Sequence, residues 1–121
     1  MKSKEKENTS ILDPEFFESR KQVGEDFVEK LMAIFYQEAP KLINNIRNEA
    51  RNGISQDLAG LGHKMKGMCL NVGATYLSEM GKKLEEKCSQ NSFQEINELI
   101  DEMEDVFKRT KIEMERILTK S

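Results

Sequence analysis

The sequence predicts an all-α protein: an antiparallel four-helix bundle with a short extra helix near the N-terminus. Apolar residues recur at intervals of three and four along four long segments, which is the spacing that gives a helix one buried face. The composition favours helices over strands, because it is rich in Glu, Lys, Leu and Met and contains 2 prolines in 121 residues. The connections between the segments are short, so consecutive helices would lie antiparallel.

The N-terminal part predicts a tail and then a short helix. Residues 1–10, MKSKEKENTS, are charged or small, and we expect them to be disordered. Asp13 and Pro14 are typical of a helix start, with the aspartate as the N-cap and the proline at the first helical position. The helix should continue to about Lys21, and its two adjacent phenylalanines could cover one end of the core. Residues 11–121 would then form a single bundle domain.

The second helix is expected from Glu25 to about Asn52. Pro40 lies inside it and predicts a kink, because proline removes a backbone donor and clashes with the preceding turn. The apolar period resumes in nearly the same phase after the proline, which favours one kinked helix over two. The residues expected on its inner face are Phe27, Leu31, Ile34, Phe35, Leu42, Ile46 and Ala50.

Three more helices should follow. Ser55 is the expected N-cap of the first, which would end at Gly73. The others are expected from about Thr75 to Ser89 and from about Ser92 to Leu118. The inner face of the penultimate helix would hold Leu77, Met80, Leu84 and Cys88, and that of the last would hold Phe93, Ile96, Leu99, Ile100, Met103, Phe107, Met114, Ile117 and Leu118.

Composition excludes several classes of protein. A net charge of −3 argues against general nucleic-acid binding. No apolar run reaches the roughly eighteen residues that a membrane span needs. The polar N-terminus lacks the hydrophobic core of a signal peptide, so we expect a cytoplasmic protein, either free-standing or excised from a longer chain. We also expect a monomer.

The sulfur-containing residues are interpreted as core residues. Cys69 and Cys88 both fall on apolar stripes, which predicts buried, reduced thiols. A disulfide between them is possible by number alone, without a supporting pattern. The 7 methionines are best explained as core filler, the alternative being a Met-rich binding surface.

His63 is the only histidine in the chain. At about 100° per residue, it points roughly 170° away from the centre of the apolar stripe of its helix, so it should face water. That stripe comprises Leu58, Leu61, Met65, Met68, Cys69 and Val72.

The neighbours of His63 on this outer face are unusual. Gly60 and Gly67 occupy positions that flank a helical side chain, although each interior glycine costs about 0.5–1 kcal/mol relative to alanine. Lys66 lies one turn on, roughly 60° to one side, where its ammonium can approach the ring. An exposed nucleophilic nitrogen, cleared flanks and a nearby cation suit a group that accepts a phosphoryl group.

These residues also carry a family resemblance. HKMKG followed by LNVGA resembles the histidine-containing phosphotransfer (HPt) domains of multistep phosphorelays, and so do the flanking runs TYLSEMGKKLEE and FYQEAP. The resemblance extends over nearly the whole chain after about Leu12. Gly62 departs from the usual alanine and should soften the helix without blocking the chemistry. Met68 departs from the usual small residue and should change packing only.

The resemblance implies a phosphocarrier without kinase activity of its own. His63 would accept a phosphoryl group on Nε2 from the aspartate of one response-regulator receiver domain and pass it to another, downstream of a sensor or hybrid histidine kinase. Lys66 would neutralise charge, and Gly67 would let the receiver approach. The receiver would bring the Mg²⁺, so no cofactor or metal is expected on this chain. The residues expected at the partner surface are Gly60, Lys64, Asn71, Lys82 and Lys83.

Other interpretations of His63 have weaker support. An idle surface histidine does not explain two adjacent glycines. Di-iron bundles use Glu-x-x-His pairs, and zinc needs more ligands than this chain offers. Cys69 points roughly 120° away from His63, which argues against a catalytic Cys–His pair. The Gly-x-x-x-x-Gly-Lys-Ser/Thr loop of ATP-binding proteins is absent.

Two other function classes stay open. One is a helical adaptor that binds receiver domains without carrying phosphate, and the other is an unrelated helical scaffold. The basic residues could be an ordinary solvated face, or they could cluster around His63 and attract an acidic partner. These residues are Lys64, Lys66, Lys82, Lys83 and Lys87.

Overall fold

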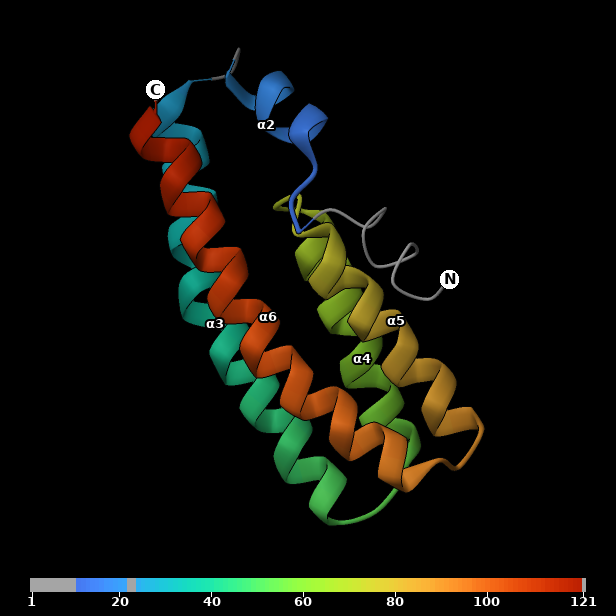
Figure 1. Ribbon diagram of the computed structural model, residues 1–121. Helices are drawn as coiled ribbons and strands as arrows, with labels where there is room; N and C mark the ends of the chain where they lie inside the picture. The colour runs from blue at the N-terminus through green and yellow to red at the C-terminus, as the bar shows by residue number, and fades with distance from the viewer. Residues whose placement is uncertain (1–10, 22–23, 121) are drawn as a thin grey trace.

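The computed structural model describes residues 11–21 and 24–120 (Figure 1). Within those ranges the chain forms five helices and no strand. The four long helices alternate in direction along the chain, which confirms the antiparallel four-helix bundle. The tail expected at residues 1–10 lies outside the described part. The helices are α2 (Pro14–Lys21), α3 (Glu25–Arg51), α4 (Gln56–Leu70), α5 (Thr75–Ser89) and α6 (Phe93–Lys120).

The helix ends follow local side-chain chemistry. The Ser55 hydroxyl accepts a hydrogen bond from the backbone amide of Leu58 at 3.1 Å, so the expected N-cap of α4 is confirmed. The carboxylate of Asp13 accepts one from the amide of Glu15 at 3.0 Å, as a cap of α2 should. α3 passes through Pro40 without interruption, which confirms one helix over two.

α4 ends earlier than expected. Its last residue is Leu70 rather than Gly73, and residues 71–73 form a turn. Gly73 has φ +71°, a left-handed conformation that glycine adopts without a steric penalty. A side chain there would also collide with the ring of Phe16, since a Cβ built on Gly73 would lie 2.9 Å from it.

α2 closes one end of the bundle. α3 and α6 are long and extend past the α4–α5 hairpin, and α2 lies above the end of that hairpin, beside the extended ends of α3 and α6 (Figure 1). The rings of Phe16 and Phe17 meet edge to face, with centroids 5.2 Å apart, and Phe17 is buried. The backbone amide of Asp13 donates to the carbonyl of Gly73 at 2.8 Å. The expectation that the two phenylalanines cover an end of the core is therefore confirmed.

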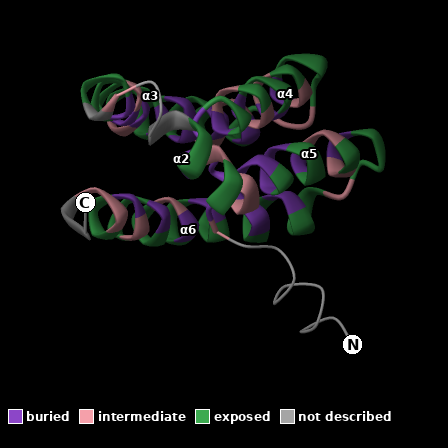
Figure 2. Cartoon of the chain, turned by 90° about the horizontal axis from the view of Figure 1, so that it is seen from above, coloured by how far each residue is buried: buried purple, intermediate pink, exposed green. Residues whose placement is uncertain are grey.

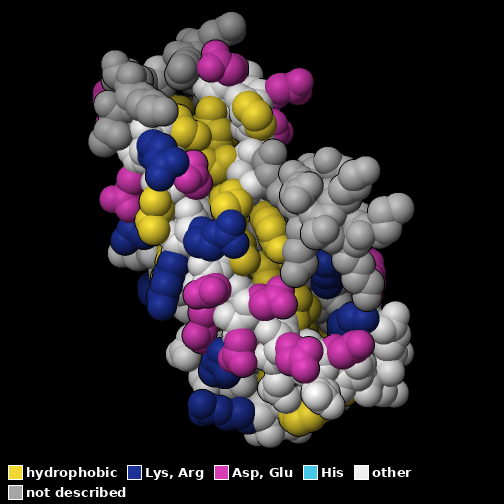
Figure 3. Space-filling view, viewed as in Figure 1, with side chains coloured by type: hydrophobic (Ala, Val, Ile, Leu, Met, Phe, Trp, Pro, Cys, Tyr) yellow, Lys and Arg dark blue, Asp and Glu magenta, His cyan; other side chains and the backbone are white. Residues whose placement is uncertain are grey.

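The core runs the length of the bundle, with buried residues on the inward sides of the long helices (Figure 2). The methionines contribute much of it, as expected of core filler: Met32, Met65, Met80, Met103 and Met114 are buried, and Met68 is partly buried against the core. On the face shown in Figure 3, acidic and basic side chains surround a band of apolar ones. No helix in the described ranges has both the length and the apolar character that crossing a bilayer requires.

Three residues expected on inner faces are exposed instead. Phe27 and Ile34 are 43% and 58% exposed on α3, and Phe93 is 48% exposed at the start of α6. The buried stripe of α3 passes through Val28 and Phe35, one position further along, and one position turns a side chain by about 100°. Phe93 precedes the first fully buried residue of α6 by about one turn, where the bundle ends.

Both cysteines are free and buried, which confirms the interpretation as reduced core thiols. Cys69 lies on α4 with its Sγ 3.5 Å from the Sδ of Met65. Burial raises the pKa of the Cys69 thiol to about 12. Burial, and then the charge of Glu85, raise the pKa of the Cys88 thiol. The thiolate, which is the reactive form, is therefore scarce at both positions.

We expect the cysteines of the folded protein to resist alkylation. At pH 8 a thiol with a pKa of about 12 is ionised in roughly one molecule in ten thousand, and Cys69 is also shielded from the reagent. Timed iodoacetamide labelling followed by mass spectrometry should show slow modification in buffer and ordinary rates in urea. Fast labelling of Cys69 in the folded protein would contradict its buried position.

Candidate functional site

His63 projects from the middle of α4 into solvent. Its side chain is 69% exposed. Leu58, Met65 and Cys69 on the opposite side of the same helix are fully buried, and this anchoring fixes the orientation of α4. The sequence prediction that the ring faces water is therefore confirmed.

The surface along α4 is open on both sides of the ring. A Cβ built on Gly60 or on Gly67 would meet no heavy atom within 4 Å. Neither glycine is therefore required for packing within this chain. Together they leave bare backbone on either side of His63, as the sequence predicts.

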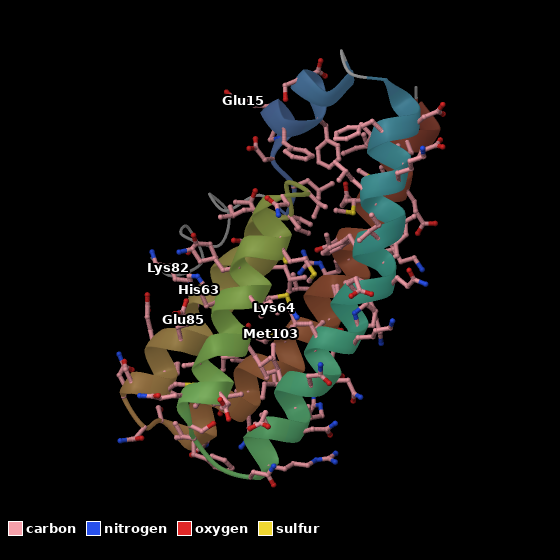
Figure 4. All side chains as sticks on the ribbon, turned by 180° about the vertical axis from the view of Figure 1, so that it is seen from behind. Glu15, His63, Lys64, Lys82, Glu85 and Met103 are labelled. Carbon is pink, nitrogen blue, oxygen red and sulfur yellow. The ribbon has the colours of Figure 1, made fainter. Side chains whose placement is uncertain are left out.

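The nearest charged partner of His63 is Glu85 of α5. Its Oε1 lies 3.3 Å from Nδ1 of the imidazole (Figure 4). A carboxylate can only accept a hydrogen bond, so a hydrogen bond across this contact requires the ring hydrogen to be on Nδ1. In the neutral ring the lone pair then belongs to Nε2, and no described residue is in hydrogen-bond contact with that atom. The contact thus directs the nucleophilic nitrogen outward.

α4 and α5 approach closely beneath this pair. Gly62 and Gly81 are both buried, and a Cβ on Gly81 would lie 2.6 Å from the carbonyl oxygen of Gly62. A Cβ on Gly62 would lie 2.8 Å from the carbonyl oxygen of Gly81. The expectation that Gly62 merely softens its helix is incomplete, because its missing side chain admits the backbone of α5. Met68, the other departure from the family pattern, packs against the core as expected.

A polar contact ties the same two helices together one turn further along. The buried hydroxyl of Ser78 donates to the backbone carbonyl of Lys66 at 3.0 Å. Ser78, Gly81 and Glu85 recur at intervals of three and four, so they share one side of α5. We call these three residues the α4-facing stripe of α5.

Lys66 is half-buried and is held by its backbone at this interface. A Cβ on Gly81 would lie 2.7 Å from the Lys66 amide nitrogen. The residue stands one turn beyond His63, so its flexible side chain can bring an ammonium towards the ring. Lys64 is exposed and lies on the other side of the α4 ribbon from Glu85 (Figure 4).

The other residues expected at the partner surface lie at different distances and directions from His63. Lys82 is exposed on the same edge of the molecule as His63 and Glu85 (Figure 4). Lys83, also exposed, is turned about 100° further round α5, away from α4. Asn71 is the exposed C-cap of α4, two turns beyond the histidine. Lys87 pairs with Glu95 of α6 at 3.1 Å and is thereby directed away from His63.

Sequence reasoning missed the α4-facing stripe of α5. Two small residues and a glutamate at intervals of three and four, directly after the helix that carries the histidine, were a usable signal. Their importance depends on how α5 is rotated against α4, which the period of α5 alone does not reveal. Among the described residues, no three His, Cys, Asp or Glu side chains come together as metal ligands would.

Comparison with known proteins identifies the family. A family model described as the Hpt domain matches residues 30–117. The chain belongs to the Hpt domain family. Its fold is similar to the crystal structure of histidine-containing phosphotransfer protein B (HptB) from Pseudomonas aeruginosa PAO1, with a TM-score of 0.82 and 26% sequence identity over 92% of this chain and 96% of that one. No curated protein matches the sequence.

Family membership confirms the resemblance predicted from the sequence and gives the class of function. This Hpt domain acts in phosphotransfer within phosphorelays, and Hpt domains interact with receiver domains. The exposed imidazole, its cleared flanks and the carboxylate behind it are the features of this chain that suit such a task.

Proposed function

We propose that His63 accepts a phosphoryl group on Nε2 from the aspartyl phosphate of one receiver domain and passes it to the aspartate of another. The observation that carries this proposal is a single exposed imidazole whose Nδ1 lies within hydrogen-bond distance of Glu85. The exposed backbone of Gly60 and Gly67 lies on either side of it. Phosphoryl transfer asks little covalent chemistry of the protein, and positioning and charge stabilisation dominate its rate.

The transfer step balances without an added reagent. The Nε2 lone pair attacks phosphorus, the bond from phosphorus to the receiver's carboxyl oxygen breaks, and the aspartate leaves as a carboxylate. The hydrogen on Nδ1 stays in place while the ring takes on positive charge. The Glu85 carboxylate, 3.3 Å away, faces that charge. Transfer to the second receiver is the same step in reverse.

Lys66 and Gly67 take supporting roles in this proposal. The Lys66 ammonium would lie near the phosphoryl oxygens and offset their charge, while its backbone is fixed against α5. Gly67 would let the receiver surface approach the backbone of α4, which is open there. The residues proposed to meet the partner are Gly60, Lys64, Asn71, Lys82 and Lys83.

The partners would supply the remaining chemistry. A receiver domain would bring the Mg²⁺ that neutralises phosphate charge, and a sensor or hybrid histidine kinase would supply the phosphoryl group upstream. The absence of a cofactor from this chain, a monomeric state and a cytoplasmic location stay predictions from the sequence. The adaptor alternative differs in one respect, because it needs receiver binding but no phosphorylated histidine.

We predict that His63→Gln abolishes phosphorylation and leaves the fold intact. The substitution removes the nucleophile at a solvent-exposed position, so it should change helix content little. Labelling by a phosphorylated receiver domain, followed by an acid-lability test, measures the first effect, and circular dichroism the second. Acid-labile phosphate retained on the variant would remove His63 from the mechanism. Wild-type protein that binds receivers but takes no label would favour the adaptor.

We predict that Gly67→Leu slows transfer from a receiver domain by about tenfold or more, which corresponds to about 1.4 kcal/mol in the barrier. A bulky side chain on this open surface would obstruct docking without disturbing the core. Gly67→Ala is the matched control, because its small Cβ meets no neighbouring atom. A Gly67→Leu variant with the transfer rate of the control would show that the clearance has no role.

A further inference from the structure

We propose that Gly62 and Gly81 are positioning residues for His63: their backbone contact sets the α4–α5 spacing at which the Glu85 carboxylate reaches Nδ1. The consequence for phosphoryl transfer rests on the proposed function of His63. The geometric part does not, because it concerns the unphosphorylated ring.

The first support is the tightness of the contact. The distance from an added Cβ on Gly81 to the Gly62 carbonyl oxygen is 2.6 Å, and to the Lys66 amide nitrogen 2.7 Å. Both neighbours are helical backbone, which cannot rotate aside as a side chain can. An ordinary contact needs about 3.5 Å, so even one methyl group would push α5 outward by most of an ångström.

The second support is register. Glu85 lies one turn after Gly81 on α5, and His63 directly follows Gly62 on α4. The glycine contact therefore lies immediately beneath the hydrogen-bonded pair. Ser78 lies one turn before Gly81, and its hydroxyl donates a hydrogen bond to the carbonyl of Lys66. The whole α4-facing stripe of α5 thus contacts the segment of α4 that carries His63 and Lys66.

The third support is the length of the hydrogen bond that depends on this spacing. At 3.3 Å, the Nδ1–Oε1 distance is close to the upper limit for such a bond. An outward shift of most of an ångström would break it. The free imidazole would then place its hydrogen largely on Nε2, because no acceptor would hold the hydrogen at Nδ1. A nitrogen that carries hydrogen has no lone pair with which to attack phosphorus.

The chain provides its own controls for this idea. Gly60 and Gly67 lie on the same helix as Gly62, and an alanine at either would meet open space. All of these positions gain helix propensity on substitution by alanine. Of these glycines, only Gly62 and Gly81 lie in the interface between α4 and α5. A purely structural role for the pair would alter stability and leave the hydrogen of the His63 ring where it is.

The test is a spectroscopic one on the uniformly ¹⁵N-labelled chain of 121 residues. Two-bond ¹H–¹⁵N correlation spectra report which imidazole nitrogen carries the hydrogen, and the chain has 1 histidine to observe. Spectra are recorded at mildly alkaline pH on wild type, Gly81→Ala, Gly62→Ala and the Gly60→Ala control, with Glu85→Ala as the reference for a broken contact. We expect wild type and Gly60→Ala to hold the hydrogen on Nδ1. Both variants of the pair should shift it to Nε2, as the reference does.

The functional measurement is the rate of phosphorylation by phosphoramidate, a small phosphoryl donor that needs no docking surface. We expect Gly81→Ala to be phosphorylated about fivefold more slowly than wild type, because fewer molecules present a free Nε2 lone pair. Ile46→Val, a mild core substitution on α3, controls for a general loss of stability and should leave the rate unchanged.

The outcomes separate this proposal from the proposed function. Folded Gly81→Ala with the wild-type hydrogen position and rate would overturn the positioning role. Should Gly81→Ala not fold, Gly62→Ala decides by the same two readings, since its closest contact is the longer, at 2.8 Å. A shifted hydrogen in a protein whose wild type takes up no phosphate would uphold the positioning role and refute the phosphoacceptor.

Discussion

Direct contact between the backbones of α4 and α5 is the constraint on which the site depends. Packed helices usually stand 8–10 Å apart because side chains keep them separate. At Gly62 and Gly81 there is no side chain on either helix, and the backbones approach so closely that a Cβ on either glycine would lie 2.8 Å or less from the carbonyl oxygen of the other. This close approach brings the Glu85 carboxylate within reach of an imidazole that otherwise faces water. An exposed residue is thereby held by contacts made within the core.

The chain uses helical glycine in two opposite ways. Gly62 and Gly81 remove side chains from an interior interface, where there is no room for them, whereas Gly60 and Gly67 remove them from a surface that has room to spare. Each of these glycines weakens its helix by up to about 1 kcal/mol relative to alanine. The inner pair offsets this cost by packing. No packing offsets this cost at Gly60 and Gly67, and the geometry explains these two glycines by the access that they give to His63.

Much of the fold could be predicted from the sequence, because helical periodicity and capping residues are local signals. The orientation of His63 followed from the apolar stripe on its own helix. The errors at Phe27 and Ile34 show the limit of that signal: two neighbouring apolar positions compete for one buried face, and tertiary packing decides between them. Glu85 could not be assigned to the site, because its role depends on the rotation of α5 relative to α4.

The two long helices and the two short helices of the bundle have different roles. α3 and α6 are the long pair that extends beyond the hairpin, while α4 and α5 hold the histidine and its supporting contacts. Substitutions on the outer face of α6 are therefore expected to have little effect on the geometry around His63. Substitutions in α5 are more restricted, although in the proposed reaction this helix contacts no atom that is bonded to phosphorus. Ser78, Gly81 and Glu85 all contact α4, so a substitution at any of them would change the surroundings of the imidazole.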